Sequence, residues 1–262
     1  MANFVDRKIV LTAKPVLTIE GQEHLVNLYE NAGANWNDLE RNVFGSSTCA
    51  AVIATAAGRG CYRSWDVPNE ATATPADYLK NILRQKHYSV LEHTSFTFHI
   101  ENVSRAATHE IVRHRHFGFS QESQRFVLEK RGRDIVCPPL LRENKEAQEW
   151  LNNLADEAFD IRDGLVSRIK GERDDLKRKE IVEAARAVLP NAAATSLFMT
   201  GNARSWVEFI DKRDSPAADA EIREVAQEIH EQLAEAFPEV FGEEATKLWR
   251  GISNQEGVKN DK

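Results

Sequence analysis

The sequence predicts a globular chain that mixes α-helices with a few β-strands. Of its 262 residues 42% are hydrophobic, which is enough to bury a sizeable core. Residues 94–102 alternate apolar and polar side chains, as a half-buried strand does. Residues 143–170 instead place apolar side chains at helical spacing, which predicts an amphipathic helix. No shift of composition between such segments marks a linker.

Proline and capping residues predict where several elements begin and end. Residues 8–18 favour an edge strand, because Pro15 cannot donate a backbone hydrogen bond to a neighbouring strand. Thr74 and Pro75 are typical of a helix start, so residues 76–86 should be helical. Other expected features are a helix near residues 23–30, a charged connection or solvated face over 172–180, a short helix ending at Leu189, and a helix that starts at Ser215–Pro216.

Ser104 can cap a helix that continues through about Arg115. On that helix Arg105, His109 and Arg113 recur every four residues, so they form one basic stripe. This stripe leads directly into the most polar segment of the chain.

Composition limits the classes of partner. The net charge is −7, which disfavours a nucleic-acid-binding protein that works by bulk charge. Residues 1–20 lack the pattern of a signal peptide, and no apolar run approaches membrane-spanning length, so we expect a cytoplasmic protein without a membrane or nucleic-acid partner. The three cysteines, Cys49, Cys61 and Cys137, show no CxxC spacing, which favours reduced thiols.

Residues 113–125 carry the densest chemistry in the chain. Arg113, His114 and Arg115 are followed, after a short turn, by hydroxyl and amide side chains and by Arg125. Arginine forks match phosphate oxygens, and amides can bind the edge of a base. The segment therefore predicts a site for a phosphorylated ligand that also forms hydrogen bonds.

Several commoner explanations of these residues fit less well. His109 and His114 nearly form the zinc motif HExxH, but five residues of helix separate them by roughly 140°. Gly58-Arg59-Gly60 is only a fragment of the dinucleotide motif GxGxxG. Ser123 lacks a GxSxG elbow, so a hydrogen bond to a ligand suits it better than a nucleophilic role. The residues alone leave open a metal-dependent hydrolase and a non-enzymatic nucleotide- or RNA-binding module.

The spacing of Arg113-His114-Arg115 and Ser123 resembles the R-H-R-x7-S signature of flavin-dependent thymidylate synthases. Further segments fit the same family in the same order: His87-x-Ser89-x-x-Glu92-His93, Arg186-x-x-Leu189-Pro190, Asn202-x-Arg204-Ser205, Arg213, and Glu221-Ile222. The likeness covers roughly residues 50–235, and so many ordered motifs make an accidental match improbable.

The resemblance implies an α+β fold in which mixed helices surround a small antiparallel-rich sheet, as a single domain over residues 1–262. It implies a homotetramer with active sites between subunits. The reaction would be the methylation of dUMP to dTMP, with 5,10-methylenetetrahydrofolate as carbon donor and with FAD and NADPH as the source of reducing equivalents. In this family no cysteine adds to the uracil ring, so Cys137 needs no catalytic role.

The resemblance also assigns ligands residue by residue. FAD-contacting positions are His87, Ser89, Arg113, His114, Arg115, Gln121, Asn202, Arg204 and Glu208. dUMP-contacting positions are Glu110, Ile111, Val112, Arg113, Gln121, Glu122, Ser123, Gln124, Arg125, Arg186 and Arg213. Arg213 would be catalytic, because a fixed cation beside uracil favours the N3-deprotonated, electron-rich ring. Glu110, Gly118, Gln121 and Glu208 differ from residues common in the family.

Overall fold

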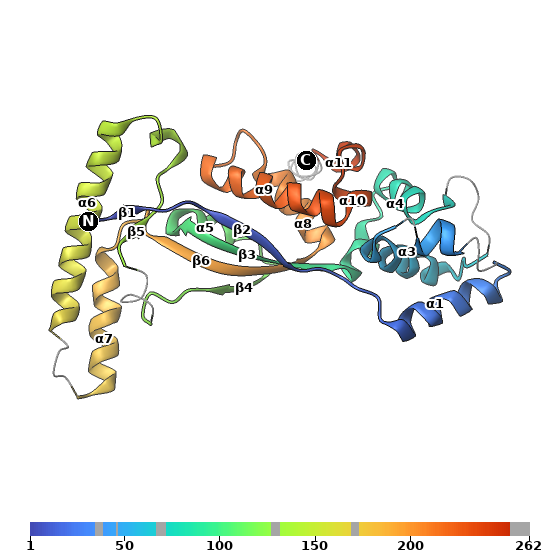
Figure 1. Ribbon diagram of the computed structural model, residues 1–262, viewed down its shortest axis with the longest axis horizontal. Coiled ribbons are helices and arrows are strands. Elements are labelled where there is room, and N and C mark those ends of the chain that lie inside the picture. Colours follow the sequence, from blue (N-terminus) through green and yellow to red (C-terminus); the bar gives the residue numbers. More distant parts are fainter. Residues whose placement is uncertain (35–38, 46, 67–71, 127–131, 169–172, 252–262) are drawn as a thin grey trace, which may run out of the picture. The chain divides into compact units, whose positions relative to one another are not determined.

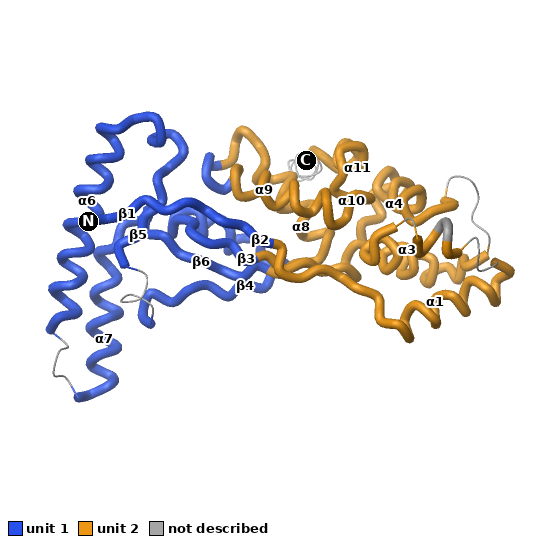
Figure 2. The backbone as a smooth tube through the Cα atoms, viewed as in Figure 1, with its two compact units in different colours: residues 1–10, 99–199, 219–222 blue, residues 11–98, 200–218, 223–262 orange. Residues whose placement is uncertain are grey.

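The computed structural model describes residues 1–34, 39–45, 47–66, 72–126, 132–168 and 173–251 (Figure 1). The chain forms two compact units (Figure 2). Unit 1 contains residues 1–10, 99–199 and 219–222, and unit 2 contains residues 11–98, 200–218 and 223–262. None of the described helices is long and apolar enough to cross a membrane.

A four-stranded sheet has the strand order β2-β3-β6-β4, and its strands are β2 (Lys8–Ala13), β3 (Ser95–Ser104), β6 (Ala194–Asn202) and β4 (Gly118–Gln121). β2 is an edge strand, as predicted, but it ends at Ala13 rather than at residue 18. The strand stops before Pro15, which has no N–H to donate to a neighbouring strand. Helices accompany this small antiparallel sheet, so the predicted α+β class is confirmed. That one domain extends over residues 1–262 stays a prediction.

Unit 1 contains the paired helices α6 (Lys145–Ser167) and α7 (Asp175–Ala185). It also contains β4, most of β6, and β1 (Asn3–Phe4), which pairs in parallel with β5 (Asp134–Ile135). Its shorter helical elements are α5 (Arg105–Ile111) and the 3-10 turns η4 (Pro139–Leu141) and η5 (Arg186–Val188). Helix α6 contributes Ala155 and Phe159 to a buried cluster that also contains Ala2 and Ile135.

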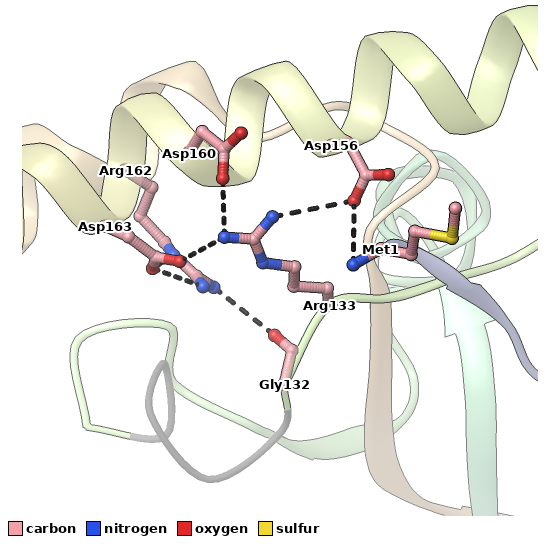
Figure 3. Close-up of polar contacts among 7 residues, drawn as sticks. All are labelled: Met1, Gly132, Arg133, Asp156, Asp160, Arg162 and Asp163. Carbon is pink, nitrogen blue, oxygen red and sulfur yellow. Dashed lines mark hydrogen bonds and ion pairs between the residues drawn. The ribbon is translucent and has the colours of Figure 1, made fainter.

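Arg133 fastens the start of β5 to helix α6 (Figure 3). Its guanidinium lies 2.7 Å from carboxylate oxygens of Asp160 and Asp163, and 3.6 Å from Asp156. The amino group of Met1 lies 3.5 Å from the same Asp156 oxygen. Because one helix face binds both segments, the β1–β5 pair is held against α6.

Unit 2 is mainly helical. Its elements are α1 (Ile19–Asn31), the π-helical turn η1 (Glu40–Phe44), α3 (Cys49–Tyr62), α4 (Pro75–Arg84), the 3-10 segment η3 (Tyr88–His93), α8 (Ala203–Arg213), most of α9 (Ala220–Ala236), α10 (Pro238–Phe241) and α11 (Glu243–Trp249). Trp206 and Trp249 are fully buried, and each indole N–H donates to a backbone carbonyl, at 3.0 Å to Gly201 and 2.7 Å to Val240. The large rings are therefore buried without leaving a donor unsatisfied.

Two predicted helix boundaries were wrong. α5 ends at Ile111 rather than near Arg115, because the next bonds, such as that from the N–H of Arg113 to the carbonyl of Glu110, close a tighter turn. Of the two interpretations of the charged stretch over 172–180, the structure supports the solvated face: residues 173–180 are exposed, and Asp174 caps α7. The helix expected from Ser215 begins at Ala220, because Ser215 instead accepts hydrogen bonds that close a turn before the helix.

Thr74 caps α4 as predicted, and we expect its replacement by alanine to lower the free energy of unfolding by about 1 kcal/mol. The Thr74 hydroxyl accepts from the N–H of Asp77 at 3.1 Å and donates to its carboxylate at 2.7 Å. Chemical denaturation measures the change, and Thr74→Ser, which keeps the hydroxyl, is the matched control. An alanine variant as stable as the wild type would contradict this role of the hydroxyl.

Candidate functional site

The predicted ligand-binding residues fall into one set in each unit. Unit 2 carries His87, Ser89, Asn202, Arg204, Glu208 and Arg213, whereas unit 1 carries residues 110–115, 121–125 and Arg186.

A pocket of about 410 Å³ in unit 2 contains three of the predicted FAD residues. Its lining residues come from α3, α4, η3 and α8, and they are Gly58, Cys61, Tyr62, Tyr78, Ile82, Lys86, His87, Tyr88, Ser89, Val90 and Arg204. The set combines two permanent cations with an imidazole, a serine hydroxyl and tyrosine rings. Such a mixture suits a ligand that has both an anionic part and a flat ring.

The end of α4 brings residues 86–89 to this pocket. The N–H of Lys86 donates to Leu83 and that of His87 donates to Ile82, which closes the last turn of the helix. Lys86 has a φ of 59°, a left-handed conformation that costs a non-glycine residue about 1 kcal/mol. Lys86 lines the pocket, and residues with a strained backbone are often found in functional sites.

Arg204 enters the pocket from the first turn of α8 and is held by two carboxylates. Its guanidinium lies 2.6 Å from Glu92 and 3.5 Å from Glu208, and the hydrogen bond that it donates to Glu92 is the main reason that the pKa of Arg204 is raised. Asn202 caps α8 through its side-chain oxygen, 2.9 Å from the N–H of Ser205. Asn202 and Glu208 therefore have clear structural roles in orienting Arg204.

Gly58 and Tyr78 form a wall that the sequence did not indicate as such. A Cβ atom at Gly58 would lie 2.2 Å from the Tyr78 hydroxyl oxygen, so a side chain there would displace the ring. Below the ring lies the buried Arg59, whose guanidinium carbon is 5.2 Å from the Tyr78 centroid. The glycines at 58 and 60, considered above as a fragment of a dinucleotide motif, lie inside helix α3. Glycine in a helix interior is unfavourable and was the signal of close packing here.

In unit 1, Gln121 and Glu122 attach the end of β4 to its neighbours. The Gln121 amide donates to the hydroxyl of Thr108 on α5 at 3.0 Å. Glu122 exchanges two hydrogen bonds with Ser196 on β6: its N–H donates to the Ser196 carbonyl at 3.0 Å, and its carboxylate accepts from the Ser196 N–H at 3.2 Å. These contacts place residues 121–125 beside α5.

The next residues form a turn that carries Arg125. The N–H of Phe126 donates to the Ser123 carbonyl at 3.0 Å, and the Ser123 hydroxyl accepts from the N–H of Arg125 at 3.4 Å. The Arg125 guanidinium forms an ion pair with Glu183 of α7. A predicted ligand-binding arginine thus has a carboxylate partner that holds it in position.

Arg125 and Arg186 interact with Glu183, and Arg186 also interacts with Arg105. We call these four residues the arginine cluster. The hydrogen bond from Arg125 is the main cause, and the charge of Arg186 a lesser one, of the lowered pKa of Glu183. Burial and then repulsion by Arg186 lower the pKa of Arg105. The charge of Lys179 also lowers the pKa of Glu183. Cations therefore outnumber the one carboxylate here, and the excess of positive charge suits a phosphate dianion.

Arg105 was missing from the predicted ligand residues, although its place in the basic stripe was a signal. The remaining predicted residues of unit 1 differ in exposure. Arg113 and Arg115 are exposed in the turn after α5, while the side chain of Ile111 is fully buried, so that residue can reach a ligand only through its backbone. The ligand assignments themselves stay predictions.

Comparison with known proteins shows consistent similarity. A family model described as "Thymidylate synthase complementing protein" matches residues 46–239. The chain is 46% identical over 201 residues to the flavin-dependent thymidylate synthase of Mycobacterium tuberculosis, which covers 74% of this chain and 80% of the relative. It is 44% identical over 198 residues to the flavin-dependent thymidylate synthase of Mycolicibacterium vanbaalenii, covering 74% and 79%.

A solved structure shares the fold. It is the UMP/dUMP methylase PolB from Streptomyces cacaoi bound with 5-Br UMP, with a TM-score of 0.63, 19% identity, and coverage of 95% of this chain and 98% of that one. At this identity the likeness is evidence for the fold alone.

The thiol of Cys137 should react more slowly than that of Cys61. Burial raises the pKa of Cys137 against the opposing charge of Arg142, so less thiolate is present near neutral pH, whereas Cys61 is exposed. Peptide mass spectrometry after timed alkylation measures both rates, and Cys61→Ser should remove the faster signal. Labelling of Cys137 as fast as Cys61 would contradict the prediction.

Proposed function

Because the chain belongs to the family of flavin-dependent thymidylate synthases, we propose that it methylates dUMP to dTMP. The observation that carries the proposal is the family match over residues 46–239, which includes the pocket and the arginine cluster. The methyl carbon comes from 5,10-methylenetetrahydrofolate, and two electrons come from NADPH through FAD, so tetrahydrofolate is released. The enzyme works as a cytoplasmic homotetramer with active sites between subunits.

The unit 2 pocket fits part of FAD. Arg204 and Lys86 supply positive charge, and the Ser89 hydroxyl supplies a further hydrogen bond for phosphate oxygens. Tyr78, supported by Arg59, offers a flat face to a ring. When bound, FAD supplies the hydride chemistry of the reaction. The protein itself binds and orients the groups that react.

The arginine cluster fits the phosphate of dUMP. Its excess of positive charge complements the dianion, and the turn at Ser123 places a hydroxyl and backbone donors beside Arg125. Arg213 then acts on the base, since a fixed cation lowers the free energy of the uracil ring in its N3-deprotonated form. That ring is electron-rich and can attack the one-carbon unit without a cysteine adduct.

The purified protein should be yellow, with a flavin absorbance spectrum that NADPH bleaches under anaerobic conditions. Addition of dUMP and methylenetetrahydrofolate should then restore the oxidised spectrum and produce dTMP, which chromatography measures. A protein that takes up no FAD, stays colourless and binds RNA in a salt-sensitive way would instead support the non-enzymatic binding module.

Arg186→Ala should weaken dUMP binding by about tenfold, because it removes a charge-assisted hydrogen bond to phosphate. Binding of deoxyuridine, which has no phosphate, should be unchanged. Titration calorimetry measures both ligands, and Arg178→Ala, an exposed arginine on the preceding helix α7, is the matched control. Equal weakening of both ligands would remove Arg186 from the phosphate site.

A further inference from the structure

We propose that Arg250 is a positioning residue that holds Arg213 in place for dUMP. The inference rests on the proposed function. Arg213 is the last residue of α8, and the end of a helix frays readily because its last carbonyl groups lack partners within the helix. The position of the Arg213 guanidinium therefore depends on what holds residues 211–214.

The segment that follows α11 binds the end of α8 on both sides of Arg213. Arg250 forms an ion pair with the carboxylate of Asp214, and its guanidinium also donates to the Asp214 carbonyl oxygen at 3.3 Å. The N–H of Gly251 donates to the Asp211 carboxylate at 2.6 Å. Asp211 precedes Arg213 by two residues and Asp214 follows it, so the two contacts fix the backbone that carries Arg213.

Other contacts make this attachment rigid. Gln227 on α9 donates to the second oxygen of Asp214 at 2.8 Å, and the N–H of Asp214 donates to the Ile210 carbonyl at 2.8 Å. The Arg250 guanidinium carbon lies 5.3 Å from the ring centroid of Trp249, which is fully buried. The side chains of Asp214 and Arg250 are only 17% and 31% exposed, so water screens the pair less than a fully exposed one.

The ion pair also has an electrostatic consequence for Arg213. Asp214 is adjacent to Arg213 in the chain, and its negative charge attracts any nearby cation. Because Arg250 neutralises the Asp214 carboxylate, the attraction between Asp214 and the Arg213 guanidinium is reduced. Arg250 thus both anchors the end of α8 and favours an Arg213 that faces its ligand. Arg250 lies after residue 239, where the family match ends.

The test is a double-mutant cycle on dUMP affinity, measured by titration calorimetry with the FAD-loaded protein. Arg250→Ala should weaken dUMP binding by about tenfold when Arg213 is present. In the Arg213→Ala background the same change should alter affinity by less than about twofold, since the group being positioned is gone. Arg250→Lys keeps the charge but loses the planar fork, and should fall between wild type and alanine.

Lys247→Ala is the control, because Lys247 lies on α11 but pairs only with Glu243 and Glu244 among the described residues. Equal weakening by Arg250→Ala in both backgrounds, or none in the wild-type background, would overturn the inference. If Arg250→Ala does not fold, Arg250→Lys and Asp214→Asn take its place in the same cycle. A wild-type protein without affinity for dUMP would refute the proposed function itself, whereas Arg213→Ala with wild-type affinity would refute only the role of Arg213 and this inference.

Discussion

The hydrogen bonds between Ser104 and Glu221 organise unit 1. Ser104 is the last residue of β3 and the cap of α5, and it is almost fully buried. Its N–H and hydroxyl donate to the two oxygens of the Glu221 carboxylate, at 2.8 and 2.6 Å, while its oxygen accepts from the N–H of Ala107. Bonds to a charged acceptor contribute roughly 1.5–3 kcal/mol each. The direction of α5, and so the place of the exposed Arg113–Arg115 turn, follows from this junction.

The proposed phosphate sites lie in a chain with a net charge of −7, and their arginines are paired with carboxylates. Arg204 is paired with Glu92 and Glu208, and Arg125 is paired with Glu183. Each of these pairs is partly exposed, so water screens it and it contributes little to stability. Such pairs keep long side chains ordered before a ligand arrives, yet they are weak enough for a phosphate to share or replace the carboxylate. Order in the unliganded site reduces the entropy lost on binding.

Local features of the structure could be predicted from sequence, whereas distant pairings could not. Pro15, Thr74 and the apolar spacing of α6 act within a few residues, so the edge strand, the helix cap and the long helix were predicted. The carboxylate partners of Ser104 and Arg204 lie more than a hundred residues away in the chain, and no local pattern indicates them. For the same reason Arg105 was recognised as basic but not as part of a cluster with Arg186. Gly58 in the interior of a helix was a signal of close packing, but no local pattern indicates that its partner is Tyr78 on another helix.

Arg59 is a buried cation behind the wall of the proposed FAD pocket. In the described part of the chain, its guanidinium donates to the carbonyl oxygens of Ser64 and Thr72 at 2.8 Å and lies beside the rings of Tyr29 and Tyr78. Carbonyl dipoles and ring faces stabilise the charge but do not cancel it, as a carboxylate would. The positive field therefore reaches the pocket that Tyr78 lines, in an interior where charges are weakly screened. The same residue supports the Tyr78 ring, so one side chain contributes both the shape and the charge of the pocket wall.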